Sequence, residues 1–195
     1  MQQAVKAAGG EHRLTLSEIL DGLIEDKVIS AEAAEQLKKE RRYYRGSLHP
    51  LAIVADQKWK KGNALLTLDA LTEWLAKRAG LEYLHIDPLK IDFAAVTEVM
   101  SSAYATRFRI LPVGVSAKET IVATAEPHVR EWEAELARIS KREIKRVIAN
   151  PLDIERYQVE FYNLAKSIKG ANRTASAGRD DWSTAREKST RGASR

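Results

Sequence analysis

The sequence predicts an α+β protein, with a helical N-terminal subdomain followed by a small mixed sheet covered by helices. Three observations predict this class. Apolar residues recur at helical spacing before residue 60. β-Branched residues crowd two short arms, Arg109–Val115 and Thr120–Thr124, on either side of a polar turn. Between them and around them, extended and helical patterns alternate in the order β-α-β-β-α-β-α, which favours a sheet covered by helices.

The first three predicted helices each carry a start signal. Thr15-Leu16-Ser17-Glu18 has the spacing of a capping box. Ser30 can cap a second helix that runs to about Arg42, and Pro50 suits the first turn of a third helix that runs through Trp59. The first helix places these residues on one face: Leu16, Ile19, Leu20, Leu23 and Ile24.

The middle of the chain reads as a linker, a helix, a strand and a second helix. Lys60-Lys61-Gly62-Asn63 has the composition of a linker. A helix over 68–79 should end at Gly80, because glycine tolerates the left-handed φ found past a helix C-terminus. A strand over 81–86 follows. Asp92 can then cap a helix that continues through Tyr104.

The hairpin and the elements after it complete the predicted sheet. Pro127 stops the second arm, and we expect Val113, Val115 and Ile121 to be core residues. A helix over 128–140 and a short strand over 145–148 follow. Asn150-Pro151 begins a last helix, whose predicted buried stripe is Ile154, Tyr157, Phe161, Leu164 and Ile168.

Composition divides the chain into four predicted segments. Residues 166–195 hold eight Lys/Arg and three Asp/Glu, whereas residues 1–165 hold 24 of each kind. We therefore expect a disordered leader (1–12), a helical N-terminal subdomain (13–62), an α/β domain (63–169) and a disordered basic tail (170–195). The chain has no cysteine, which excludes disulfides and thiolate chemistry.

Four phrases in order resemble the N-terminal domain of the type II secretion and type IV pilus assembly ATPases. They are HPLAIVADQKW (49–59), LTLDALTEWLAKRAGLEYLHIDPLKID (66–92), the hairpin with its flanks, AYATRFRILPV to IVATAEP (103–127), and IKRVIANPLDIERYQVEFYNLAKSI (144–168). In that family the ATPase core lies C-terminal to this region. None of the ten glycines begins a G-x-x-x-x-G-K-[ST] phosphate loop. The resemblance therefore implies a chain that is not an enzyme.

The resemblance also implies a partner. In this family the region docks the ATPase to the cytoplasmic domain of an inner-membrane platform protein. We thus expect a cytoplasmic module, peripheral to the inner membrane through its partner and joined to an ATPase core in a full-length protein. No apolar run reaches the length of a membrane span, so direct insertion is not expected. Neither a cofactor nor nucleic acid is expected as a ligand. A nucleic-acid or membrane binder that works through the basic tail is the least supported class, since Trp182 is the tail's one aromatic residue.

Some family members bind cyclic di-GMP through a tandem Arg-Leu-Gly motif, which gives the alternative function. Arg13 could open a first copy, with Gly22 and Gln36 at later positions. Thr15 stands where that motif has glycine, and Glu18 stands where it has an aliphatic residue. A second copy is only faintly present around residues 60–66. Arg13, Gly22 and Gln36 are therefore weak candidates for a cyclic dinucleotide, and we expect weak binding or none.

Catalytic and metal sites are not predicted. The four histidines, His12, His49, His85 and His128, are scattered, and no pair has the i, i+4 spacing of helical metal ligands. No G-x-S-x-G turn is present. The carboxylates are interleaved with basic residues as on a solvated surface.

Overall fold

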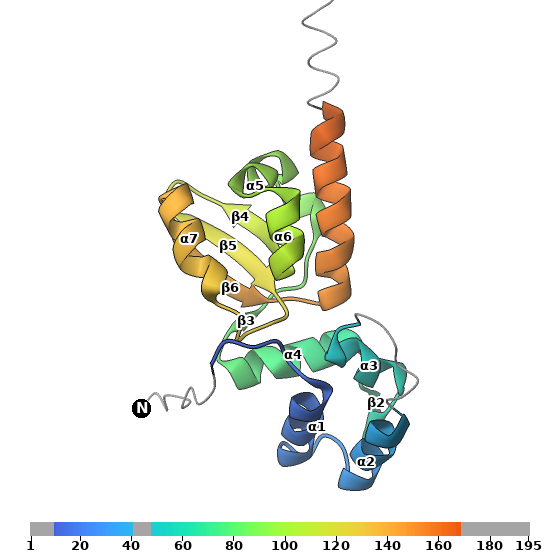
Figure 1. The fold of residues 1–195 in the computed structure, drawn as a ribbon. Helices are drawn as coiled ribbons and strands as arrows, with labels where there is room; N and C mark the ends of the chain where they lie inside the picture. Colours follow the sequence, from blue (N-terminus) through green and yellow to red (C-terminus); the bar gives the residue numbers. More distant parts are fainter. Residues whose placement is uncertain (1–9, 41–47, 169–195) are drawn as a thin grey trace, which may run out of the picture.

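The computed structural model describes residues 10–40 and 48–168 and confirms the α+β class (Figure 1). The leader before residue 10, the end of the predicted second helix and the basic tail lie outside these residues. The division at residues 62 and 63 stays a prediction. Within the described part, helices α1 to α4 gather below the sheet in the view of Figure 1.

The first helices begin where the sequence predicts. They are α1 (Leu16–Glu25), α2 (Ala31–Glu40), α3 (Pro50–Asp56) and α4 (Leu68–Ala79). Thr15 and Glu18 form the complete capping box. Gly80 ends α4 with a φ of 66°, as expected for a left-handed cap.

The third helix is shorter than predicted, and the predicted linker is a hairpin. α3 ends at Asp56, and Lys58 takes a φ of 53°. Trp59 then starts the hairpin of β1 (Lys60–Lys61) and β2 (Ala64–Leu65), where its carbonyl accepts the Leu66 N–H at 2.8 Å. The hairpin leads directly into α4.

Apolar residues of all four helices share one core cluster. Leu20 and Leu23 of α1, Leu37 of α2, Leu51 of α3 and Leu71 of α4 are at most 1% exposed within it. Ile148 of the sheet belongs to the same cluster. The helical part is thus packed onto one end of the sheet.

The main sheet has the order β3-β6-β5-β4. Its strands are β3 (Glu82–Tyr83), β4 (Ile110–Val115), β5 (Glu119–Thr124) and β6 (Glu143–Ile148). β4 and β5 form the predicted antiparallel hairpin, with a register shift between Pro112 and Gly114. β5 pairs with β6 in parallel, and so does β3. β3 is shorter than the predicted strand over 81–86, whereas β6 begins two residues before the predicted 145.

The helix predicted after Asp92 is two helices. α5 (Phe93–Val99) ends because Met100 is extended, and Ser101 caps α6 (Ser102–Phe108) by accepting the Tyr104 N–H at 3.2 Å. The short 3₁₀ helix η2 (Pro88–Lys90) precedes α5. α6 and α7 (Glu131–Ser140) lie in front of the sheet in Figure 1.

The two faces of the sheet pack against different helices. Leu111 and Ala123 join Ile154, Tyr157 and Phe161 of the last helix, at 151–168. From the other face, Ile110 and Val122 join a cluster that contains Trp132 and Leu136 of α7 and Phe108 of α6. Neighbouring strand residues therefore alternate between the two layers.

Two expected sets of core residues are only partly in the core. Leu164 and Ile168 are 48% and 46% exposed, because the last helix extends beyond the sheet at its C-terminal end (Figure 1). In the hairpin, Val113, Val115 and Ile121 are half-buried. Its fully buried residues include Ile110, Leu111, Val122 and Ala123.

Candidate functional site

The residues just before α1 tie the helical part to the α/β part. The Arg13 guanidinium donates to the Arg107 carbonyl at 2.9 Å, and the Leu14 N–H donates to the Glu126 carboxylate at 2.8 Å. His12 stacks on His128, with ring centroids 4.9 Å apart. Since Arg107, Glu126 and His128 all belong to the α/β part, this segment forms a strap across the junction.

Glu126 and His49 form a buried polar pair beneath the strap, and each is 2% exposed. The His49 Nδ1 accepts the Leu51 N–H at 3.2 Å, so Nε2 carries the hydrogen and donates to the Ala125 carbonyl at 3.2 Å. Burial lowers the pKa of His49 to about 4, and the charge of Arg109 acts in the same direction. The imidazole is therefore neutral at pH 7, and its 3.7 Å contact with Glu126 is not an ion pair.

Burial also raises the pKa of Glu126, although the Leu14 N–H and the charge of Arg13 oppose that rise. A buried carboxyl of this kind often marks a functional site. Here its partners are backbone groups and cations of the strap and the sheet end. The pair therefore has a structural role at the junction of the two parts.

A groove of about 580 Å³ lies between α1, α4 and the turn after β5. Its charged lining residues are Glu18, Asp21, Glu25 and Arg78, and His128 also lines it. Arg78 pairs with Glu25 and, at 3.2 Å, with Asp26. The groove thus carries excess negative charge, which disfavours an anionic ligand.

Gly22 allows α1 and α4 to lie close together beside this groove. A Cβ at residue 22 would lie 3.1 Å from both the Arg78 Nε and the Trp74 ring. The Trp74 Nε1 donates to Asp26 at 2.7 Å, which fixes the indole. Sequence patterns did not indicate Trp74 or Arg78 as groove residues, because they meet α1 only through the packing of α4.

The structure does not bring the three candidate cyclic dinucleotide residues into one pocket. Gly22 lines the groove, whereas Arg13 is bonded to Arg107. Gln36 lies on α2, where its amide donates to Glu40 at 3.4 Å, and it lines a separate shallow depression. A ligand that contacts all three would need a different arrangement of these helices.

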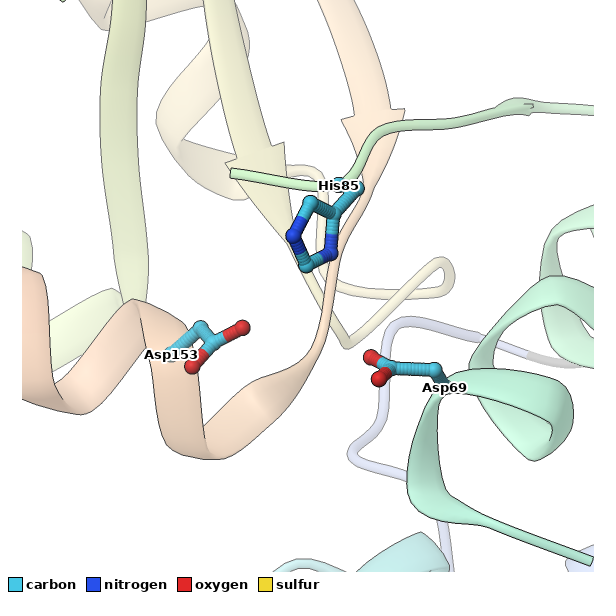
Figure 2. Close-up of side chains that lie close together, drawn as sticks. All are labelled: Asp69, His85 and Asp153. Atoms are coloured by element: carbon cyan, nitrogen blue, oxygen red, sulfur yellow. The ribbon is translucent and has the colours of Figure 1, made fainter. Parts of the chain in front are cut away.

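A second cluster, Asp69, His85 and Asp153, was not predicted from the sequence. One ligand atom from each residue lies within 4.8 Å of the others (Figure 2). The residues come from α4, the segment after β3 and the last helix. They lie far apart in the sequence, so no spacing rule could have indicated the group.

Comparison with known proteins identifies the α/β part. Residues 79–168 match the family model of the MshEN domain. These residues are thus similar to MshEN domains. Type IV pilus assembly ATPase TfpB of Acinetobacter baylyi is 33% identical over 112 residues, which are 57% of this chain and 19% of that protein. The resemblance to N-terminal domains of the type II secretion and type IV pilus assembly ATPases is thereby confirmed.

Two solved structures resemble the chain in fold. MshE with cdg has a TM-score of 0.49 at 16% identity, over 74% of this chain and 98% of that one. The N-terminal domain of XpsE has a TM-score of 0.43 at 14% identity, over 75% of this chain and 96% of that one.

The chain spans about a fifth of the length of TfpB, and residues 79–168 match the model of MshEN, a non-catalytic domain. These matches agree with the prediction that this chain is not an enzyme. Among the described residues, no helix is both long and apolar enough to cross a bilayer.

Proposed function

We propose that this chain is the docking module of a type IV pilus assembly or type II secretion ATPase. It binds the cytoplasmic domain of an inner-membrane platform protein and so holds an ATPase core, present in the full-length protein, at the membrane. Its place is then cytoplasmic and peripheral. The 33% identity to a pilus assembly ATPase is the observation that carries the proposal.

The last helix offers a surface for this partner. Leu152 and Val159 are 44% and 63% exposed, and a spacing of seven residues places them on one side of the helix. Residues 1–165 hold equal numbers of acidic and basic residues. Affinity should therefore come from apolar contact with a polar rim, and salt should weaken it only modestly.

Calorimetry with the platform domain encoded near this gene tests the proposal. We expect 1:1 binding that Val159→Glu weakens at least tenfold, or about 1.4 kcal/mol. Leu65→Glu is the matched control, because Leu65 is 46% exposed on the β1–β2 hairpin, away from the last helix. Absence of binding to the platform domain would refute docking. Equal binding by Val159→Glu and the wild type would refute only this surface.

The alternative function is a cyclic di-GMP-binding regulatory module of the same family. The match to the MshEN family model supports it, since some members of the ATPase family bind this nucleotide. The acidic groove and the separation of Arg13, Gly22 and Gln36 weigh against it here. We therefore place docking first.

A further inference from the structure

Three side chains that meet at the junction of the helical and α/β parts carry a further inference. Asp69 lies in the first turn of α4, His85 follows β3, and Asp153 lies in the first turn of the last helix. Figure 2 shows the two carboxylates approaching from opposite sides, with the imidazole between them. One ligand atom from each lies within 4.8 Å of the others.

The partners of these side chains leave room for a cation. Asp69 accepts from two neutral donors, the Asn150 amide at 2.9 Å and the Tyr83 hydroxyl at 3.4 Å. Asp153 pairs with Arg156 at 3.0 Å through one oxygen. Within the described residues, the imidazole of His85 has no hydrogen-bond or ion-pair partner, and its side chain is exposed.

The donor set selects the class of ion. One imidazole with two carboxylates suits a divalent transition metal such as Zn²⁺, rather than Mg²⁺, which prefers oxygen ligands. Around a tetrahedral Zn²⁺ with bonds of about 2.1 Å, neighbouring ligand atoms lie about 3.4 Å apart. Rotation of the exposed His85 side chain and of the half-buried Asp153 side chain closes that difference, and water completes the shell.

We propose that Asp69, His85 and Asp153 bind a Zn²⁺ ion that joins α4 to the last helix. The ion crosslinks the helical part to the α/β part. Asn150 and Tyr83 hold Asp69 in place, as outer-shell donors do at other metal sites. Binding therefore stabilises the relative position of the two parts.

Calorimetric titration of Zn²⁺ into the metal-free chain at about pH 7.5, where a free imidazole is neutral, tests this site. We expect one ion per chain and a higher thermal midpoint with Zn²⁺. His85→Ala and Asp69→Asn should each weaken binding at least tenfold and abolish the midpoint shift. Mg²⁺ at the same concentration should produce neither effect.

His128→Ala is the matched control. Of the other histidines, His49 is buried with both ring nitrogens bonded, and His12 is bonded to Gly10 and Glu18. His128 is exposed like His85 but lies beside the groove. It should keep wild-type Zn²⁺ affinity. Three results would overturn the proposal: no Zn²⁺ binding up to about 1 mM, unchanged binding in both site variants, or binding lost in His128→Ala.

Discussion

At the scale of single residues, the buried pair beneath the strap has the largest expected effect on stability. Glu126→Ala leaves the buried Leu14 N–H without its acceptor. We expect a loss of about 1–3 kcal/mol in the free energy of unfolding. Urea denaturation measures that loss.

Glu126→Gln is the control for this substitution, because its amide oxygen can still accept the Leu14 N–H. Glu126→Gln should lower the free energy of unfolding clearly less than Glu126→Ala does. Equal losses would show that the bond to Leu14 contributes nothing measurable, and that the space filled by the side chain accounts for the effect.

The buried neutral imidazole predicts a dependence of stability on pH. The pKa of His49 is about 4 in the folded chain against 6.5 ordinarily, so the unfolded state binds a proton more readily. The stabilisation that the neutral His49 gives the folded state is fully present above pH 6.5. It is lost as pH falls toward 4, by up to about 3 kcal/mol. Glu126 acts in the opposite sense, because its raised pKa favours the folded state at low pH.

Unfolding measured between pH 4 and 7 separates the two contributions. The wild type should lose stability on acidification, and His49→Gln should lose less. Glu126→Gln should lose more, since the opposing effect is removed. Identical slopes in the wild type and His49→Gln would show that the imidazole is solvated or charged in solution.

At the scale of elements, the hairpin is a core structure through its first arm rather than its tip. Leu111 is 0% exposed near the start of β4, whereas Val115 is half-buried at the end of the strand. Leu111→Ala should lower the free energy of unfolding by about 2–5 kcal/mol, as for other buried leucines. Val115→Ala should cost distinctly less.

Thermal or urea unfolding of both variants checks this order. The expected order differs from the sequence-based expectation that Val115 is a core residue, because Val115 is only half-buried at the end of β4. A Val115→Ala variant less stable than Leu111→Ala would mean that the turn end is covered in solution.

At the scale of the whole molecule, the chain should show no ATP hydrolysis. It contains no loop in which backbone N–H groups and a lysine cradle phosphates. A coupled phosphate-release assay on purified protein checks this. Turnover that follows the protein through successive purification steps would contradict the assignment of a non-catalytic module.

Cyclic di-GMP should bind weakly or not at all. The groove carries three carboxylates, and Arg13 is already bonded to a backbone carbonyl. Calorimetry of the wild type and Arg13→Ala tests this expectation, with Arg142→Ala as a control for loss of a surface charge. Tight binding lost in Arg13→Ala alone would favour the regulatory function over docking.

The sequence by itself determined the local features of this protein. Thr15, Gly80 and Asp92 mark helix ends because a cap needs only a side chain or a φ value within a few residues of the helix. The β4–β5 hairpin was predictable for the same reason. The four phrases likewise indicate the ATPase family, because that resemblance depends on the order of residues along the chain and on no tertiary contact.

Only the tertiary structure decided features that depend on distant contacts. The last helix shows this, since Leu164 and Ile168 continue its apolar spacing but lie beyond the sheet that covers Ile154 and Phe161. The approach of His49 to Glu126, and of His85 to two aspartates, follows from the packing of the helical part on the sheet. No sequence periodicity indicates such contacts, because each partner is placed by a different helix, strand or loop.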